Sequence, residues 1–312
     1  MPVFKIHHIT QYQYSWPVRE SVNEIKIYPY QSYDQEVLQH DLVITSSPEI
    51  DTYTDYWGNK TGVFNCLIPH QQLMIDSRLM VRTLGSADID INFTSTLDDV
   101  KQEIDNQLHL VELTKTDHIS SRHLIDQIIL QVHADNKSIA EIVYDCCGYI
   151  YSNFKYIKGI TSIESTVDEI LEQKAGVCQD FAHVMLHVLR TLGIPSRYVS
   201  GYICPNKKGM RGEGATHAWV EALIPQQGWQ GIDPTNMVWV TNNHVKLAVG
   251  RNFTDCTPMK GTFKGPARQE LFVTVSVSYE DGGMFEDINS VPVQAQLSRA
   301  ELEAIDRQVQ QQ

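Results

Sequence analysis

Hydrophobic residues in about the first eighty positions alternate with polar ones, which is the period of a strand with one buried face. Turn-forming residues such as Trp16-Pro17 and Trp57-Gly58-Asn59 separate the alternating runs. This punctuation predicts several short strands and a small β-sandwich, which we expect to form an N-terminal β-rich domain over residues 1–95. The clearest runs are Phe4, Ile6, Tyr12 and Tyr14; Leu38, Leu42 and Ile44; and Leu73, Ile75, Leu79 and Val81.

The hydrophobic spacing becomes helical in the middle of the chain. Apolar residues recur at intervals of three and four from Ser121 to Val132, and a second helix is predicted from Ser138 to about Tyr156. Ser165 is a candidate cap for a short third helix, because acidic residues follow in its first turn. We therefore expect a helical connector over residues 96–135.

The segment that begins at Cys178 predicts the core of a second domain. A helix from Cys178 to Leu192 has one continuous apolar face, so we expect it to be buried. Strand-like segments follow at 197–203, 218–224, 228–233 and 271–278. These elements predict an α+β fold in which the helix packs on an antiparallel sheet. We expect this core to occupy residues 136–296, with a polar C-terminal helix or tail over 297–312.

Cys178, His217 and Asp233 are the candidate chemical groups of this core. The first N–H groups of a helix have no intrahelical partner, so they can stabilise a thiolate and then an oxyanion. A histidine can take the thiol proton, and a carboxylate can fix the tautomer of that histidine. Two antiparallel strands that turn near Pro225 bring positions 217 and 233 level, because 225 is their midpoint. The spacing thus predicts a Cys–His–Asp site.

The sequence around these residues resembles the bacterial transglutaminase-like superfamily. The resemblance extends to the N-terminal half, which is similar to the β-rich domain that precedes the core in this bacterial group. It implies a papain-like core and a cysteine-protease-like triad, with Cys178 as nucleophile, His217 as base and Asp233 as the orienting acid. The matching segments are Gly176 to His183, Leu189 to Tyr202, His217 to Glu221 and Asp233 to Asn236, with Tyr12 to Ser15, Asp55 to Asn59 and Pro69-His70 in the N-terminal half.

Such a triad implies cysteine-dependent acyl transfer on an amide bond of a peptide or protein substrate. With water as the acceptor the protein is a peptidase or amidase, and with a lysine-like amine it is a transglutaminase; for a bacterial-type protein we favour hydrolysis. A catalytically silent binding module or scaffold is the alternative, against which retention of all three residue types argues. Gln179 and Tyr156 are both candidates for the second oxyanion donor. Trp219 either packs beside His217 or forms a wall of the substrate cleft.

Charge and composition limit the classes of partner and the cellular location that we expect for the protein. The chain has 25 basic and 38 acidic residues, a net charge of −13, which disfavours nucleic acid and anionic membranes as partners. No apolar run approaches the roughly 20 residues that span a bilayer, and the N-terminus lacks a signal-peptide core, so we expect a cytoplasmic protein. The six cysteines have no CxxC or zinc-like spacing, and no acidic calcium loop is present, so we expect no metal or cofactor.

Two further groups of residues have more than one interpretation. His183 and His187 lie four apart on the predicted helix but lack the glutamate of a metalloprotease motif, so we expect hydrogen-bonded structural histidines. Lys207, Lys208 and Arg211 form a basic loop near the predicted site. That loop is either simply solvated or in contact with an acidic substrate.

Overall fold

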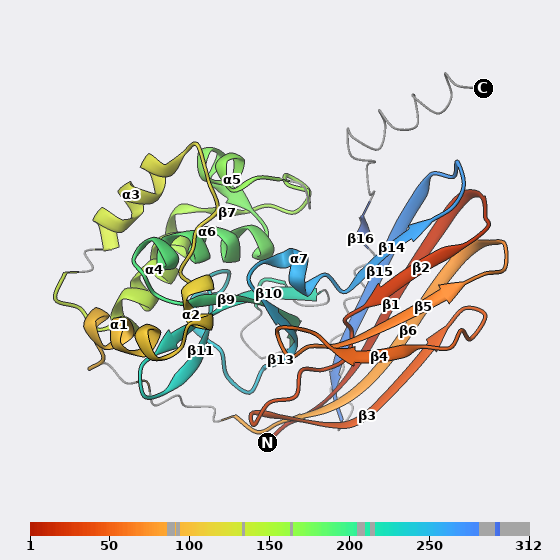
Figure 1. Ribbon diagram of the computed structural model, residues 1–312, viewed down its shortest axis with the longest axis horizontal. Coiled ribbons are helices and arrows are strands. Elements are labelled where there is room, and N and C mark those ends of the chain that lie inside the picture. The colour runs from red at the N-terminus through yellow and green to blue at the C-terminus, as the bar shows by residue number, and fades with distance from the viewer. Residues whose placement is uncertain are drawn as a thin grey trace.

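The computed structural model contains an N-terminal β-sandwich and an α+β core (Figure 1), which confirms the predicted fold class. It describes residues 1–85, 91, 94–132, 135–162, 165–204, 210–212, 216–280 and 291–293. One sandwich sheet has the order β16-β15-β1-β6-β3, with bounds Val291–Val293, Gln269–Tyr279, Val3–Val18, His70–Thr83 and Gln35–Ile44. The other has the order β14-β2-β5-β4, with bounds Met259–Phe263, Ser21–Ile25, Lys60–Cys66 and Asp51–Thr54.

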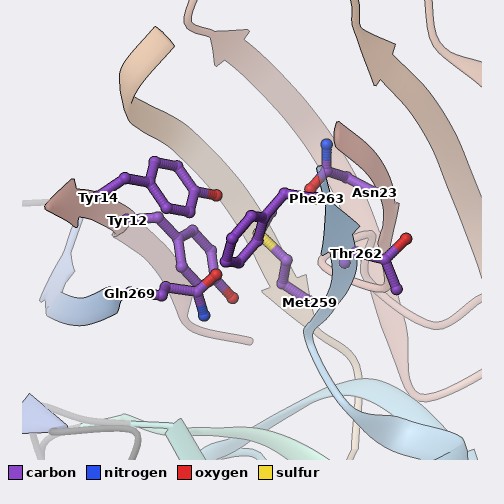
Figure 2. A pocket seen from close by; sticks show the side chains of 8 residues that line it. Tyr12, Tyr14, Asn23, Met259, Thr262, Phe263 and Gln269 are labelled. Carbon is purple, nitrogen blue, oxygen red and sulfur yellow. The ribbon is translucent and has the colours of Figure 1, made fainter. Parts of the chain in front are cut away.

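The alternating residues near the N-terminus form the sandwich core. Tyr12 and Tyr14 of β1, Ile25 of β2, Phe64 of β5 and Leu73 of β6 are buried in one cluster. Removing each such side chain from water contributes about 1.5–3 kcal/mol. The same two tyrosines line a small cavity between β1 and β14, of about 20 Å³, which is room for a single water (Figure 2).

Strand β3 departs from the expected alternation. Leu38 was predicted on the buried face, but it is exposed. A bulge between Val37 and Gln39 shifts the register of β3 against β6, and an extra residue in a strand reverses the face to which its neighbours point. Ile44, beyond the bulge, is buried as expected.

The last described strands return to the sandwich. β15 pairs with β1 from Phe4↔Tyr279 to Tyr14↔Gln269, and β14 pairs with β2. These pairings place residues 259–279 in the N-terminal sheets, in place of the core to which the sequence pattern assigned them. The reason is that β1 and β2 would otherwise each present an unpaired edge. The predicted tail over 297–312 lies outside the described residues.

The core sheet has the order β12-β11-β10-β9-β13, with bounds Val238–Trp239, Gly228–Asp233, Thr216–Ile224, Ser196–Ile203 and His244–Gly250. A short parallel pair, β7 and β8, covers Lys155–Tyr156 and Ala175–Gly176. The helices α1 to α7 cover Leu97–Asn106, His109–Glu112, Arg122–Val132, Ile139–Asn153, Val167–Gln173, Cys178–Thr191 and Phe253–Cys256. In Figure 1, α1–α6 gather at one end of the molecule and the sandwich at the other, with β9, β10 and β13 between them.

Capping boxes mark where α1, α4 and α5 begin. Ser138 caps α4 together with Glu141, at the position where the sequence predicted this helix to begin. Helix α5 is capped by Thr166, and the proposed cap Ser165 is therefore one residue off. Thr166 is the cap because Glu169 lies three residues later. The Glu169 carboxylate accepts from the Thr166 N–H, and the Thr166 hydroxyl accepts from the Glu169 N–H.

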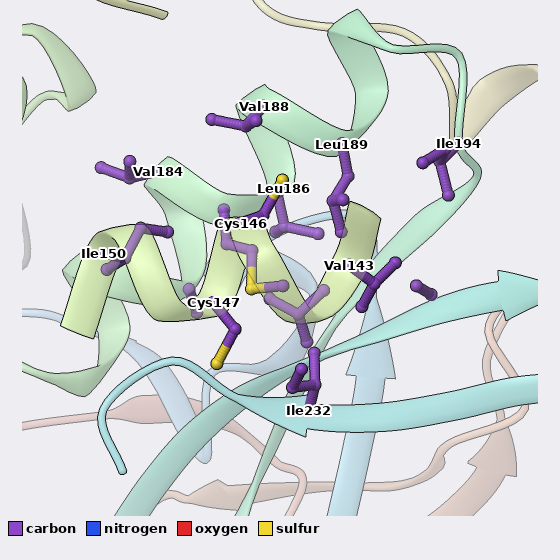
Figure 3. Packing of buried hydrophobic residues seen from close by; sticks show 14 of the residues in the cluster. Val143, Cys146, Cys147, Ile150, Val184, Leu186, Val188, Leu189, Ile194 and Ile232 are labelled. Atoms are coloured by element: carbon purple, nitrogen blue, oxygen red, sulfur yellow. The ribbon is translucent and has the colours of Figure 1, made fainter. Parts of the chain in front are cut away.

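Helix α6 is the most deeply buried helix in the described part of the chain. All ten residues from Asp180 to Arg190 other than His183 are buried. Figure 3 shows α6 packed against α4, with Ile232 of β11 beneath them. Because close-packed side chains surround the helix, its first turn is held in a fixed position relative to the sheet.

The sandwich packs on the core sheet through apolar and polar contacts. Phe4, Ile6 and Leu79 of the sandwich share one buried cluster with Tyr202 and Val245 of the core sheet. Beside this cluster, Asn59 is only 1% exposed. Its amide nitrogen donates to the carbonyl of Val249 at 2.8 Å, and its amide oxygen accepts from the N–H of Val249 at 2.8 Å.

We expect Asn59→Ala to lower the free energy of unfolding by about 1–3 kcal/mol, because the buried N–H and C=O of Val249 both lose their partner. Urea unfolding followed by tryptophan fluorescence would measure this loss. The matched control is Asn153→Ala, which removes one exposed hydrogen bond to Tyr149 and should change stability by less than about 0.5 kcal/mol. Equal effects of the two substitutions would contradict a stabilising role for Asn59.

Candidate active site

The N-terminus of α6 presents Cys178 at the first helical position, after the cap residue Val177. Asp180 holds this turn: its carboxylate accepts from the Val177 N–H at 2.7 Å and from the Thr161 hydroxyl at 2.6 Å. Gly176 is needed for this contact, since a Cβ there would lie 2.5 Å from the Asp180 carboxylate.

Two backbone donors at this helix end are available to a ligand. The N–H groups of Cys178 and Gln179 have no hydrogen-bond partner among the described residues, whereas those of Asp180 and Phe181 donate to the Val177 carbonyl. Unpartnered N–H groups at a helix N-terminus attract negative charge. Cys178 itself is partly exposed, in contrast to the five other cysteines, which are all buried.

His217 and Asp233 meet as predicted. Nε2 of His217 lies 2.9 Å from Oδ2 of Asp233, and both side chains are fully buried. The Asp233 carboxylate also accepts from the Asn236 amide at 2.7 Å and from the Thr235 N–H at 2.8 Å. Three donors thus converge on one buried carboxylate, which fixes its position and compensates its charge.

The second nitrogen of His217, Nδ1, is buried without a hydrogen bond of ordinary geometry. Burial alone would lower the pKa of His217, but the charge of Asp233, then that of Cys178, and hydrogen bonding to both raise it to about 10. Asp233 is affected in the opposite sense: burial would raise its pKa, and the charge and hydrogen bond of His217 lower it. The structure therefore brings His217 and Asp233 into contact, and the charge of Cys178 acts on the pKa of the same imidazole.

The strand register differs slightly from the predicted one. β10 and β11 pair from Val220↔Ile232 to Ile224↔Gly228, so Asp233 continues this register opposite Trp219, and not opposite His217. The difference is two positions along the strand. Because side chains alternate with a period of two, this shift leaves His217 and Asp233 on the same face as diagonal neighbours.

The other predicted site residues occupy different positions. Tyr156 pairs with Gly176 in the β7–β8 ladder, and burial followed by the charge of Cys178 raises the pKa of its hydroxyl, which places it beside the thiol. Gln179 is partly exposed next to Cys178. Trp219 is fully buried and stacks on the His217 ring at 6.3 Å between centroids, so it packs behind the histidine and does not wall a cleft.

His244 and Asn236 belong to the site but were not assigned a role from the sequence. Nε2 of His244 lies 3.6 Å from Oδ2 of Asp233, and its ring meets Trp219 edge-on at 5.2 Å. No sequence signal marks His244, because β13 was not predicted. Asn236 had a signal, since it lies three residues after Asp233 within the Asp-Pro-Thr-Asn motif.

His183 and His187 are structural in this fold. His183 accepts a hydrogen bond from the Phe253 N–H at 3.2 Å, and burial lowers the pKa of both histidines to about 4. Within the described ranges, no group of three or more histidine, cysteine or acidic side chains is arranged to hold a metal ion. No helix in the same ranges has both the length and the apolar character needed to cross a bilayer.

Comparison with known proteins identifies the family. A model of the transglutaminase-like superfamily matches residues 125–234, and a model of the bacterial transglutaminase-like N-terminal region matches residues 4–82. The chain belongs to the transglutaminase-like superfamily. The first match contains Cys178, His217 and Asp233, and the second covers the strands from β1 to β6 of the sandwich.

Individual relatives extend this transglutaminase-like assignment over most of the chain. The Mycobacterium leprae protein "Uncharacterized protein ML0607" is 32% identical over 278 residues, which cover 88% of this chain and 98% of that protein. The Pseudomonas aeruginosa "Protein-glutamine gamma-glutamyltransferase" is 30% identical over 123 residues, or 38% of this chain and 18% of that protein. A crystal structure from Cytophaga hutchinsonii, described as a "Putative Cysteine Protease", has the same fold, with a TM-score of 0.68, 22% identity and coverage of 93% of this chain and 95% of its own.

The exposure of the thiols predicts selective alkylation. We expect iodoacetamide at about pH 6 to modify Cys178 at least about tenfold faster than any other cysteine, since burial raises the pKa of the other five thiols. His217→Ala should remove this selectivity, and His123→Ala, on the exposed face of α3, should not. Peptide mass spectrometry of the labelled chain would report each site. Uniform slow labelling of all six cysteines would contradict an activated thiol.

The shifted pKa of His217 predicts a pH-dependent stability. Because the folded-state pKa is about 10 and the unfolded value about 6.5, the protonated imidazole stabilises the fold fully below pH 6.5, and this contribution is lost as the pH rises through 10. At pH 6.5, wild type should therefore have a higher free energy of unfolding than His217→Gln. At pH 10 this advantage of the wild type should be smaller by about 1–3 kcal/mol. Urea unfolding at both pH values measures the difference. Asp233→Asn should flatten this dependence; a difference that is constant with pH would contradict the assignment.

Proposed function

We propose that the protein catalyses cysteine-dependent acyl transfer on amide or peptide bonds, with hydrolysis as the favoured outcome. The observation that carries this proposal is the fully buried His217–Asp233 hydrogen bond of 2.9 Å, together with a partly exposed thiol at a helix N-terminus, that of Cys178, whose charge raises the pKa of His217. In this role Cys178 is the nucleophile, His217 the acid–base group, and Asp233 the carboxylate that orients it. The substrate is a peptide or protein.

The proposed reaction has two halves. The Cys178 thiolate attacks the amide carbonyl carbon, and the oxyanion that forms accepts hydrogen bonds from the N–H groups of Cys178 and Gln179. The C–N bond then breaks as Nδ1 of His217 gives its proton to the leaving amine, which leaves a thioester on Cys178. Water or an amine attacks the thioester while His217 takes up its proton, and the thiolate is released with the acyl product.

The second oxyanion donor is, on this proposal, the backbone of Gln179. Its N–H lies in the same helical turn as that of Cys178 and has no partner among the described residues. The Tyr156 hydroxyl lies beside the thiol and remains a candidate for a third donor. The Gln179 side chain is not required for the backbone contact.

The names of relatives support both acceptors. The Cytophaga hutchinsonii structure is described as a "Putative Cysteine Protease", and the Pseudomonas aeruginosa relative as a "Protein-glutamine gamma-glutamyltransferase". The same three residues serve either acceptor, since only the identity of the attacking nucleophile in the second half differs. A silent binding module is the weaker alternative, because such a module has no need of a buried charge pair aligned on an accessible thiol.

Incubation with a peptide library, in the presence and absence of a primary amine, would test the proposal. Mass spectrometry would read cleavage and amine incorporation together. We expect both products to disappear in Cys178→Ala and to fall about 10³–10⁴-fold in Asp233→Asn, because the amide presents the wrong group to Nε2. Cys66→Ala, a change in the sandwich, is the matched control and should retain activity. Turnover that survives in Cys178→Ala would refute the proposal, and amine incorporation without cleavage would favour the transglutaminase reaction.

A further inference from the structure

One exposed cation beside the site has no role in the reaction described so far. Arg211 lies on a short segment before β10, and its guanidinium stacks on the ring of Tyr151, 4.7 Å from the ring centroid. Arg211 forms no ion pair with any carboxylate in the part of the chain that the structure describes. The ring of Tyr151 orients the guanidinium without neutralising it.

The backbone of Arg211 is tied to the catalytic carboxylate. The Asn236 side chain accepts from the Arg211 N–H at 2.7 Å and donates to the Arg211 carbonyl at 3.1 Å. The same amide nitrogen donates to Oδ2 of Asp233 at 2.7 Å. Asn236 therefore fixes the position of Arg211 relative to the triad.

The next residue, Gly212, covers the reacting face of the histidine. Gly212 has a φ of +93°, and a Cβ there would lie 2.5 Å from Nδ1 of His217. Nδ1 is the atom that would protonate the leaving amine. Burial and the charge of Cys178 raise the pKa of the Tyr156 hydroxyl. The charge of Arg211 is one of several further effects and lowers that pKa, so Arg211 acts electrostatically on a group beside the thiol.

The two described carboxylates of the site are already bound to other groups. Asp180 is bound to Val177 and Thr161, and Asp233 is bound to His217, Thr235 and Asn236. Both are buried, whereas Arg211 is exposed. A guanidinium that an aromatic ring orients, and that forms no ion pair with the described residues, is a binding group for an anion.

We propose that Arg211 binds a carboxylate of the substrate, on the leaving-amine side of the scissile amide. We place the carboxylate on the leaving-amine side because Arg211 directly precedes Gly212, and Gly212 covers Nδ1 of His217, the atom that would protonate the leaving amine. The carboxylate is an acidic side chain or a free C-terminus next to the cleaved bond. This inference rests on the proposed function and adds the substrate class to it.

The reactivity of Cys178 with two matched alkylating reagents tests this inference without a known substrate. Iodoacetate and iodoacetamide both form an S–C bond as iodide leaves, and they differ in that iodoacetate carries a carboxylate. The quantity to measure is the ratio of their second-order rate constants at Cys178, divided by the same ratio for a free thiol such as N-acetylcysteine. Any change in the intrinsic reactivity of the thiol cancels in this ratio.

We expect Arg211→Gln to lower the normalised ratio at least about threefold, since the positive charge that would attract the carboxylate of the reagent is lost. Arg211→Lys should retain most of the ratio, and 1 M salt should reduce it in the wild type. Arg78→Gln, on the exposed face of β6, makes the same change in net charge and is the matched control. The inference is overturned if Arg211→Gln leaves the ratio at the wild-type value, or if Arg78→Gln lowers it equally.

The two proposals fail in different ways. A Cys178 that reacts with neither reagent faster than a free thiol would overturn the proposed function, whereas fast iodoacetamide labelling with an unchanged ratio would overturn the role of Arg211 alone. In the peptide library, we expect wild type to prefer amides with a carboxylate on the amine side, and Arg211→Gln to raise KM for these peptides more than it lowers kcat. An unaltered preference in Arg211→Gln would contradict the inference.

Discussion

The arrangement of the site depends on one buried charge, the carboxylate of Asp233. A carboxylate without water is stable only where donors replace its hydration, and here His217, Asn236 and the Thr235 N–H do so. Each of these donors is thereby fixed in place. The orientation of the imidazole, the position of the Asn236 amide and the path of the chain after Pro234 are all consequences of satisfying this group.

The sandwich supports the same site from behind. Trp219, which stacks on His217, belongs to a buried cluster with Val199 and Val249, against which Tyr30 and Trp57 of the N-terminal region pack. Asn59 bonds the backbone of Val249 in that cluster. A histidine ring held on its back face keeps the orientation that proton transfer requires. These contacts between the sandwich and the core sheet explain why strands from both ends of the chain complete the sandwich around the core.

Local patterns in the sequence were sufficient for much of the fold, and tertiary contacts account for the rest. The period of α6 and the turn near Pro225 were enough to place His217 and Asp233 on one face, although the three-residue turn 225–227 moves the register by two positions. The cap of α5 and the bulge in β3 depend on single residues, Thr166 and Leu38, which a periodic pattern does not resolve. The return of β14 and β15 had no local signal, because an edge that needs a partner is a property of the assembled sheet.

The residues of the proposed reaction were easier to predict from the sequence than the residue proposed to select the substrate. A thiol, an imidazole and a carboxylate have fixed tasks, so their residue types and order in the chain reveal them. The sequence marked Arg211 only as part of a basic loop that is either solvated or in contact with an acidic substrate. The role proposed for it rests on Asn236, which links Arg211 to Asp233, and on Gly212, which lies over His217. The link through Asn236 joins residues 25 apart in the sequence, and neither link affects the hydrophobic pattern. If peptidases and transglutaminases share the same three residues, the groups that distinguish their substrates must lie at the rim of the site. Such groups are recognised by their charge and exposure, and not by the spacing of hydrophobic residues.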